Sequence, residues 1–588
     1  MVNLKAMPYH LSDEDILWVK EKINSMTKEE KVGQLFFQLT SSIEEDYLRN
    51  LVEKYHLGGI RYNGMPGVAV QNHNRILQKH SKTPLIIACN TENGGDGACL
   101  DGTYIAKNIK IGATRNVNHA YNHGKYSNTE AKAVGCNMAF APVCDIHYNW
   151  ENTEIVARSF GNDCQRVAEM SKAYLEGAHS VGVACAAKHF PGNGHDFRDA
   201  HLSNNVNECN EEDWMATFGH VYKTLIDSGL DAIMGGHILM PNYMREVKAD
   251  ITDDEMIPAT LEPKIMTGLL RDKLGFNGMV VTDASHMVAM TNRMKRCDML
   301  PQAINAGCDM FLFFNDPDED FNIMLNAYNT GIISEERMEE ALTRILGLKA
   351  RMGLHKIAKE DLVPNPEALS IIGCEEHKKA SDAISKESAT LVKYKDEGVL
   401  PLTPEKYKRI MIVPVKGYSG PMDALLQMAL GGNSKKSAAL ELQERLIAKG
   451  FDAFIYESLI DKIKKQVAAG EKPSLNLYFA GKNAIEDFKA GQDLVITLFD
   501  VQTGRPAFGL SKGGGEIPWY VFELPVVGIS VNAPTMLADV PQLRTYINAY
   551  DAKPSTLDAL VDALVEGKEA FKGQDPIDSF CGLWDAKI

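Results

Sequence analysis

The sequence predicts an α/β protein in which an N-terminal (β/α)8, TIM-like barrel precedes a smaller C-terminal α/β domain with an open sheet between helices. Three observations support this. Eight apolar runs of strand length occur in the first 350 residues, stretches that can hold a helix separate most of them, and a second alternation of the same kind follows residue 390. The length of 588 residues is also too great for one ordinary core.

The eight candidate strands are short, and several are continuously apolar, as parallel strands covered on both faces must be. They are KVGQLFFQ (31–38), GGIRYNG (58–64), PLIIACN (84–90), MAFAPVCDI (138–146), VACAAKHFPG (183–192), DAIMGGHI (231–238), GMVVTDAS (278–285) and DMFLFFN (309–315). Segment 258–275 exemplifies an intervening helix, with apolar residues at helical spacing and Gly275 as a stop signal. An open doubly wound sheet is the alternative that this pattern leaves.

The predicted domain boundaries follow changes in composition. Residues 1–353 form the predicted barrel, and 354–390 form a charged linker with two prolines and one or two helices. Residues 391–588 form the C-terminal domain. Its predicted strands are 409–415, 475–481, 493–500, 525–532 and 544–550, and its clearest helical stretches are 437–450 and 555–568.

Charge and cysteine usage exclude several classes of partner. The formal net charge is -16, which disfavours nucleic acid and anionic membranes as partners. No run of about 18 uncharged apolar residues occurs, and the N-terminal segment does not read as a signal peptide, so we expect a cytoplasmic protein. The eleven cysteines form no CxxC pair, which favours free thiols over disulfides or a metal site. We expect no cofactor.

The densest polar cluster follows the fifth apolar run, in AAKHFPGNGHDFRDAHLSNN (186–205). The PGNG segment predicts a turn, so Lys188 and His189 are expected at the strand tip, and Asp199 and His201 on the loop beyond it. An aspartate near a histidine can bind one imidazole nitrogen, which leaves the other free for proton transfer. A solvated polar loop is the alternative.

A carboxylate follows the seventh apolar run. Asp283 is costly to desolvate there unless it is paired or used in catalysis, and a helix N-cap is the alternative. A retaining glycosidase needs a carboxylate nucleophile and an acid/base group. Asp283 and the Asp199–His201 pair fit those two roles.

Other predicted strand ends also carry polar residues. Asn90 and Glu92 follow the third run, Asp145 ends the fourth, and Arg158 comes soon after it. The fixed fork of donors on Arg158 suits a sugar diol. His237, at the end of the sixth run, fits a hydrogen-bonded core histidine better than a functional one.

These motifs resemble glycoside hydrolase family 3, specifically its β-N-acetylglucosaminidase branch. KHFPGNG with the downstream Asp199-Ala200-His201 is similar to the branch's KHFPGHG…D-S-H signature, at the same internal spacing. Segment 257–287 is similar to the family segment that ends in the catalytic Asp, and APVCDI and ARSFGND are similar to its APV-D and R-(S/A)-FG-D elements. The resemblance covers nearly all of 25–350 and continues more weakly to about 570.

The resemblance implies roles for particular residues. Asp283 matches the nucleophile that forms the glycosyl-enzyme intermediate, His201 the acid/base, and Asp199 its partner. It further implies a set of substrate-binding residues, which are Arg158, Lys188, His189, Asn90 and Glu92.

Three departures from the family pattern stand out. Asn193 replaces the His of PGHG, and Ala284 replaces the second carboxylate of T/S-D-D. Asn90 and Ala98 replace a sugar-binding Asp and a distal Arg. The loss of those two charges bears on recognition of the outer hydroxyls and so on gluco versus galacto preference.

The predicted function is that of a retaining β-N-acetylhexosaminidase, which removes terminal β-linked N-acetylhexosamine, with GlcNAc preferred, from short oligosaccharides or glycopeptides. A phosphorylase with the same residues remains an alternative, because a histidine acid/base is less anionic than a glutamate. A β-glucosidase is disfavoured by the Asp-Ala-His element. A non-catalytic sugar-binding protein is disfavoured because binding alone requires no nucleophile. The sequence leaves the oligomeric state open.

Overall fold

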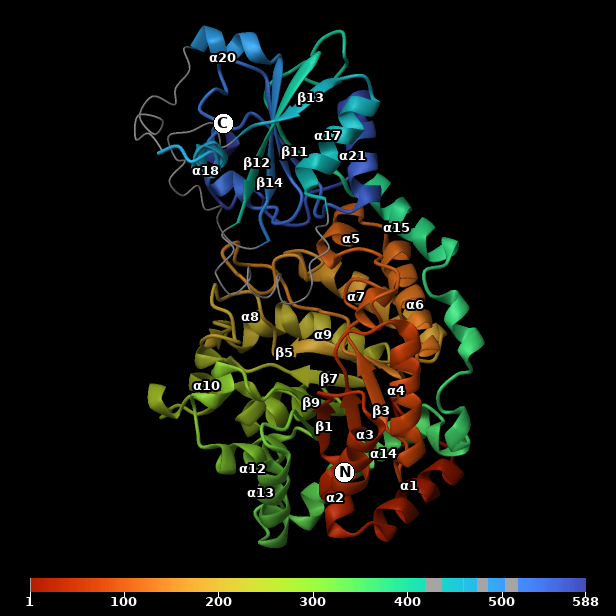
Figure 1. Ribbon diagram of the computed structural model, residues 1–588. Helices are drawn as coiled ribbons and strands as arrows, with labels where there is room; N and C mark the ends of the chain where they lie inside the picture. The colour runs from red at the N-terminus through yellow and green to blue at the C-terminus, as the bar shows by residue number, and fades with distance from the viewer. Residues whose placement is uncertain (1, 418–435, 458, 473–484, 503–516) are drawn as a thin grey trace. The chain divides into compact units, whose positions relative to one another are not determined.

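The computed structural model describes residues 2–417, 436–457, 459–472, 485–502 and 517–588 (Figure 1). It divides into two units. The first comprises Met1–Asn108 and Asn116–Ser381, and the second comprises Ile109–Arg115 and Asp382–Ile588. A closed barrel forms the centre of the first unit, and an open sheet forms the centre of the second.

Eight parallel strands close into the barrel in the order β1-β10-β9-β7-β5-β4-β3-β2. Their continuously apolar sequences are buried on both faces, as in β3 and β7. All eight predicted strands are present and the predicted (β/α)8 barrel is confirmed, against the doubly wound alternative. The strands are β1 (Phe36–Leu39), β2 (Gly59–Arg61), β3 (Ile86–Cys89), β4 (Met138–Ala139), β5 (Ala184–Phe190), β7 (Ala232–Gly235), β9 (Met279–Ala284) and β10 (Met310–Leu312).

Helices surround the barrel (Figure 1). Capping boxes begin the first two, where Ser12 and Thr27 each accept a backbone N–H three residues on. The helices are α1 (Asp13–Ser25), α2 (Lys28–Gln34), α3 (Glu45–Tyr55), α4 (Gly67–His80), α6 (Val117–Ala133), α7 (Cys164–Ser180), α8 (Glu211–Ala216), α9 (Phe218–Asp227), α10 (Pro241–Val247), α11 (Val288–Thr291), α12 (Arg296–Ala306), α13 (Pro317–Asn329) and α14 (Glu335–Arg351). Helix α5 (Asn108–Thr114) belongs almost wholly to the second unit, and α15 (Glu375–Ser388) begins in the first unit and ends in the second. Two short strands, β6 (Asn205–Val206) and β8 (Ile238–Leu239), pair outside the barrel.

The helical segment predicted at 258–275 is divided into two pieces. A 3-10 turn, η3 (Ala259–Leu261), precedes a π-helix, η4 (Lys264–Lys273). Pro263 stands at the junction, where its missing N–H and its ring are compatible with the start of a helix but not with an interior.

A buried ion cluster lies at the N-terminal ends of the barrel strands β9 and β10. Asp309, just before β10, is fully buried. Its carboxylate lies 2.8 Å from Arg271 Nη2 and Arg337 Nη2 and 3.2 Å from Arg344 Nη1, and it accepts the N–H of Val280 at 2.9 Å. Burial alone would raise the pKa of Asp309, but the arginines outweigh that effect and hold the pKa below its ordinary value. This cluster joins two strands to two outer helices.

The second unit is built on a six-stranded sheet of order β11-β16-β15-β14-β12-β13, parallel except for the β11–β16 pair. The strands are β11 (Thr390–Tyr394), β12 (Arg409–Lys416), β13 (Asp452–Ile455), β14 (Leu494–Asp500), β15 (Val526–Ser530) and β16 (Thr545–Asn548). Helices α17 (Ala438–Ala448) and α21 (Pro554–Glu566) pack on one face, and α18 (Leu459–Ala468) and α20 (Ile485–Gly491) lie on the other (Figure 1). The predicted C-terminal α/β domain is thus confirmed.

Some elements of this part of the chain differ from the sequence prediction. β11 and β13 were not predicted, and the strand predicted at 475–481 lies outside the described residues. Segment 354–390 contains the 3-10 turns η5 (Leu354–Lys356), η6 (Lys359–Asp361) and η7 (Pro366–Ile371), followed by α15.

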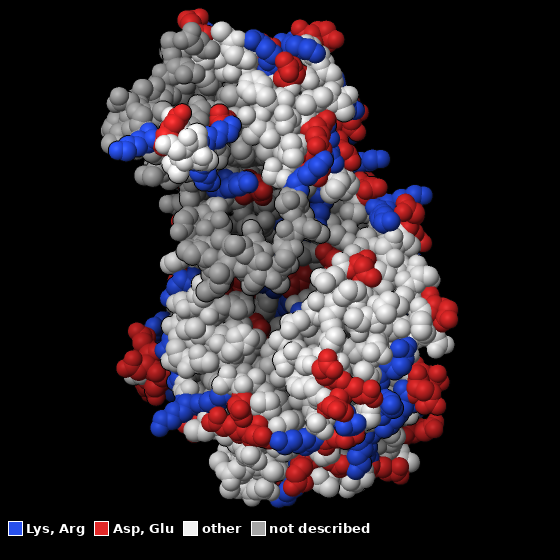
Figure 2. Space-filling model, viewed as in Figure 1, with Lys and Arg blue, Asp and Glu red and all other residues white. Residues whose placement is uncertain are grey.

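Among the described residues on the face shown in Figure 2, acidic and basic side chains are interspersed, without a continuous basic patch. Within the described part of the chain, no helix combines the length and the apolar character needed to cross a bilayer.

Candidate active site

A pocket of about 230 Å³ opens at the C-terminal ends of the barrel strands. Each strand supplies a lining residue within two residues of its C-terminal end, and these are Leu39, Arg61, Asn90, Phe140, Lys188, Met234, Asp283 and Leu312. This is the end at which barrel enzymes carry their active sites. The volume lies below the roughly 300–1,000 Å³ of pockets for drug-sized ligands, and it suits a single sugar ring.

The pocket gathers seven of the eight residues predicted for the site. These are Asn90, Glu92, Arg158, Lys188, His189, His201 and Asp283. The eighth, Asp199, does not line the pocket but is hydrogen-bonded to His201. Segments separated by almost two hundred residues of sequence therefore converge on one cavity.

Asp283 lies near the end of β9 with its side chain 16% exposed. Its Oδ1 accepts the N–H of Ala284 at 2.7 Å, and its Oδ2 lies 4.0 Å from His189 Nε2. Burial alone would raise the pKa of Asp283, but His189, His237 and Lys188, with the Ala284 N–H, outweigh burial and lower it. The carboxylate is therefore ionised, as a nucleophile must be.

His189 is held by Asp145, which is fully buried just after β4. Asp145 Oδ2 lies 2.7 Å from His189 Nδ1, and Asp145 Oδ1 accepts the backbone N–H groups of His189 and Asn193 at 3.1 and 2.7 Å. This arrangement turns the Nε2 edge of the imidazole toward Asp283.

Glu92 binds two of the cations that line the pocket, Arg158 and Lys188. Its Oε2 accepts from Arg158 Nε at 2.9 Å, and its Oε1 accepts from Arg158 Nη2 at 3.0 Å and lies 2.6 Å from Lys188 Nζ. Burial would raise the pKa of Glu92, but Arg158 and Lys188 outweigh it and hold the pKa well below its ordinary value. Glu92 is thus the counter-ion that positions both cations on the pocket wall.

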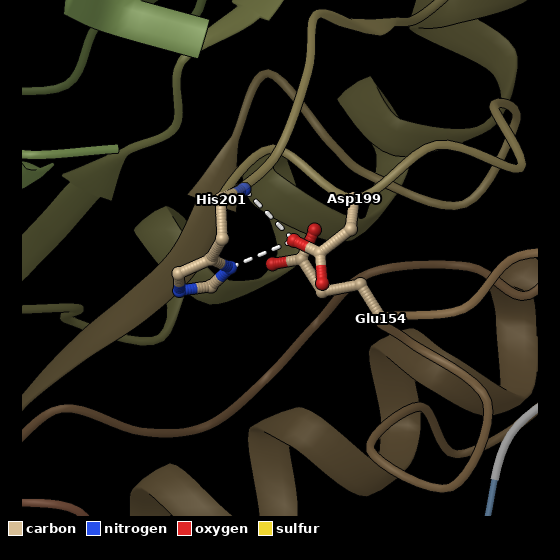
Figure 3. A group of neighbouring side chains, drawn as sticks. All are labelled: Glu154, Asp199 and His201. Atoms are coloured by element: carbon tan, nitrogen blue, oxygen red, sulfur yellow. Dashed lines mark hydrogen bonds and ion pairs between the residues drawn. The ribbon is translucent and has the colours of Figure 1, made fainter. Parts of the chain in front are cut away.

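Asp199 and His201 form a hydrogen-bonded dyad on the loop after β5 (Figure 3). Asp199 Oδ1 lies 2.7 Å from His201 Nδ1 and accepts the His201 backbone N–H at 2.8 Å. The bond fixes the imidazole so that Nε2 is left for proton transfer. The His201 side chain is 52% exposed and that of Asp199 is 26% exposed.

The dyad loop is docked on the segment that follows Asp283. The N–H of Ala289 donates to the carbonyl of Ala200 at 3.1 Å, and the N–H of Val288 donates to the carbonyl of His201 at 3.4 Å. The acid/base candidate and the nucleophile candidate are therefore held by adjoining segments of backbone.

The root of the dyad loop is the PGNG turn. Gly192 and Gly194 have φ of 121° and 122°, and a Cβ on Gly194 would lie 1.8 Å from the carbonyl oxygen of Ile146. Asn193 between them is buried, and its side-chain amide donates to Glu154 Oε2 at 2.9 Å. The residue that departs from the family's PGHG motif is thus part of a polar network inside the site.

The sequence analysis missed several residues that line the pocket, among them the charged Arg61 and Glu154. Arg61, at the end of β2, lines the pocket, whereas Ala98 is buried and does not line it. Glu154 also lines the pocket, with its side chain 5% exposed. Burial, together with the charges of Asp199 and Asp283, raises the pKa of Glu154 despite His189 and Arg158. Its place four residues before Arg158 was the available signal.

His237 is buried, as a core histidine would be. Its Nδ1 lies 2.8 Å from Thr260 Oγ1 and its Nε2 lies 3.1 Å from the carbonyl oxygen of Ala284. Burial lowers the pKa of His237. It supports the strand end that carries Asp283.

Glu154, Asp199 and His201 also bring one possible metal-ligand atom each within 4.8 Å of one another. The hydrogen bond between Asp199 and His201 accounts for much of this proximity, and Asn193 donates to Glu154. The group is therefore satisfied as a hydrogen-bonded network.

A closed parallel barrel with an ionised carboxylate, a carboxylate-bound histidine and buried polar donors around a sugar-sized pocket defines a glycoside hydrolase. The chain belongs to glycosyl hydrolase family 3, whose N-terminal domain matches residues 27–348. The predicted resemblance is thereby confirmed.

Individual relatives agree with this assignment. The chain is 34% identical over 591 residues, the full length of both proteins, to "Beta-N-acetylglucosaminidase/beta-glucosidase" of Cellulomonas fimi. It is 27% identical to "Beta-hexosaminidase A" of Pseudoalteromonas piscicida, over 72% of this chain and 73% of that protein. Among solved structures, "Beta-glucoside phosphorylase BglX" is similar with a TM-score of 0.88 and 34% identity, and the match covers 99% of each chain.

Proposed function

We propose that this chain is a retaining β-N-acetylglucosaminidase that works by double displacement. The observation that carries the proposal is the convergence of Asp283 and His201 on one pocket, with Asp199 hydrogen-bonded to the imidazole. A retaining glycosidase requires one nucleophile and one group that serves first as acid and then as base.

In the first step, Asp283 attacks the anomeric carbon while His201 Nε2 donates a proton to the leaving oxygen. The C–O bond to the leaving group breaks, and a covalent glycosyl-enzyme ester forms with inverted configuration. Asp199, hydrogen-bonded to Nδ1 of the imidazole, orients the His201 ring so that Nε2 is left for this proton transfer. Lys188, Arg158 and His189 provide donors for the sugar hydroxyls at the wall of the pocket.

In the second step, neutral His201 accepts a proton from water as the water attacks the anomeric carbon. The ester bond to Asp283 breaks, the carboxylate leaves, and the second inversion gives net retention. The cycle returns every residue to its starting protonation state, and no cofactor enters it.

We propose a terminal N-acetylhexosamine, GlcNAc in preference, as the unit removed, and a short oligosaccharide or glycopeptide as the substrate. The volume of the pocket supports removal of one sugar at a time. The Asp199-Ala200-His201 element and the names of the Cellulomonas and Pseudoalteromonas relatives support the amino sugar.

The test is hydrolysis of 4-nitrophenyl N-acetyl-β-glucosaminide against the matching β-glucoside and N-acetyl-β-galactosaminide. We expect the N-acetylglucosaminide to be cleaved fastest and the first-formed sugar to be the β-anomer by NMR. A preference for the galacto sugar would indicate that the pocket wall containing Asn90 determines which sugar configuration is bound. An α-anomer as first product, or no release from any of the three, would overturn the proposal.

A phosphorylase reaction is the second candidate. The full-length similarity to "Beta-glucoside phosphorylase BglX" supports it, as does the half-exposed His201, since a neutral imidazole repels a phosphate dianion less than a carboxylate would. Repeating the assay with and without inorganic phosphate decides between them. A phosphorylase yields the sugar 1-phosphate and speeds up with phosphate, whereas a hydrolase yields free sugar at an unchanged rate.

A further inference from the structure

Glu154 is a buried carboxylate with three separate partners on the acid/base side of the pocket. Its Oε2 accepts hydrogen bonds from Asn193 Nδ2 at 2.9 Å and from the N–H of Ala200 at 3.4 Å, and its Oε1 lies 3.7 Å from Arg158 Nη1. These contacts connect the turn after β5, the dyad loop and the sugar-binding wall.

The loop that carries Glu154 is itself attached to the dyad loop. Asn152 Nδ2 donates to the carbonyl of Asp196 at 2.6 Å, and Thr153 Oγ1 donates to the carbonyl of Phe197 at 3.2 Å. The Oδ1 of Asn152 accepts the N–H of Glu154 at 2.9 Å. The backbone of Glu154 is therefore held in place independently of the contacts of its side chain. We call this set of contacts between residues 152–154 and the dyad loop the tether. It consists of several hydrogen bonds between two loops and does not depend on one contact.

The dyad needs such support because it lies on irregular backbone. Residues 191–204 contain no helix or strand, and His201 is 52% exposed. A general acid must be held within about 0.5 Å of its productive position. Figure 3 shows the carboxyl groups of Glu154 and Asp199 on the same side of the His201 ring, and their ligand atoms lie within 4.8 Å.

We propose that Glu154 is a positioning residue for the acid/base step, which fixes the loop bearing Asp199 and His201 and joins it to the sugar-binding Arg158. The inference rests on the proposed function above. Glu154 acts through His201 and not on the leaving group itself. Its removal therefore lowers the rate only for substrates whose leaving group needs a proton. It is a feature of this chain that no family motif quoted above contains.

The test compares Glu154→Ala and Glu154→Gln with the wild type. Glutamine keeps an oxygen that accepts from Asn193 and Ala200, whereas alanine removes the tether. Glu212→Gln, which removes an exposed carboxylate on α8, is the matched charge control. Each protein is assayed on two substrates. The first is N,N′-diacetylchitobiose, whose sugar leaving group is poor and needs a proton. The second is 2,4-dinitrophenyl N-acetyl-β-glucosaminide, whose dinitrophenolate leaves without protonation.

We expect Glu154→Ala to lower kcat/KM on the disaccharide by about tenfold or more, but by no more than the roughly 10²–10⁴-fold that a general acid supplies. Its loss on the dinitrophenyl substrate should stay below about threefold. Glu154→Gln should recover most of the lost rate on the disaccharide. In a His201→Ala background, Glu154→Ala should cost nothing further, because two residues that act as a unit are not additive.

Equal losses on the two substrates, a glutamine variant no better than alanine, or additivity with His201→Ala would each overturn the inference. If Glu154→Ala does not fold, as judged by its thermal unfolding, Asn193→Asp breaks the same tether from the other side. It must then give the same leaving-group-dependent loss, and a uniform loss or none would reject the proposal. A wild type inactive on both substrates would instead remove the proposed function.

Discussion

The Nε2 atom of His189 lies 4.0 Å from Oδ2 of Asp283, and the opposite edge of the same ring is hydrogen-bonded to Asp145. The imidazole thus lies between the fully buried carboxylate of Asp145 and the partly exposed carboxylate of Asp283. It is the first of the groups that offset the burial of Asp283 and keep its pKa low. The ionisation of the proposed nucleophile therefore depends on a neighbour that does not itself react.

Replacing His189 by glutamine should shift the acid side of the pH profile. Asp283 must be ionised to attack, and loss of the imidazole raises its pKa, so activity should disappear at a higher pH on acidification. The measurement is kcat/KM against pH. His220→Gln changes a histidine on α9 that does not line the pocket, and it should leave the acid limb of the plot of kcat/KM against pH unchanged. An unmoved acid limb in His189→Gln would show that another group controls it.

Asp283→Asn should lower kcat by about a thousandfold or more, since removing a nucleophile leaves only binding and residual electrostatics. A fluorinated glycosyl inactivator should add one sugar mass to a wild-type peptide that contains Asp283, and none to the variant. Asp272→Asn, which alters an exposed carboxylate, serves as the control. Substantial activity in Asp283→Asn, or label on another residue, would contradict the assignment.

His201→Ala should depend strongly on the leaving group. The loss should reach about 10²–10⁴-fold for alkyl and sugar aglycones and stay small for 2,4-dinitrophenyl during glycosylation. Added azide should restore turnover of the activated substrate, as it needs no base to attack the intermediate. Asp199→Asn should give a weaker form of the same pattern. A loss independent of the aglycone would mean that His201 is not the acid.

Asp309→Asn should destabilise the protein by about 3–5 kcal/mol, because it leaves the three arginines without their buried counter-charge. The pKa of Asp309 is lowered in the folded protein. Its contribution to the free energy of unfolding is therefore complete above the pKa of the unfolded chain, about 3.9, and is lost as the pH falls below that value. Denaturant unfolding at pH 7 and at acid pH measures this. A wild type and variant of equal stability at pH 7 would refute it.

The barrel was predictable because its strands are buried on both faces. A short, continuously apolar run such as β3 is typical of a strand buried on both faces, and all eight barrel strands lie within runs that the sequence analysis identified. β13 was missed because Asp452–Ile455 is short and partly exposed, so it shows no such run. β11 has the sequence TLVKY, in which Lys393 interrupts a short apolar run, so it was not distinguished from the charged segment before it. The division at Pro263 depends on local geometry that apolar spacing does not report.

The placement of the candidate site residues was predictable where a residue lies near the end of a strand or just beyond it. Asp283 and His189 are of that kind, as are Asn90 and Glu92. Glu154 was missed because its position depends on a loop that folds back through hydrogen bonds from Asn152, which no periodicity encodes. The pairing of Glu92 with both cations was likewise a matter of three-dimensional proximity.

The PGNG turn has a consequence for engineering. Gly192 and Gly194 have no room for a side chain, so variation there will destroy the loop that carries the dyad. Farther along, Phe197 and Leu202 are 57% and 77% exposed on either side of Asp199 and His201. A variant library that leaves both glycines untouched can therefore diversify these two exposed positions without disturbing the turn that supports the proposed dyad.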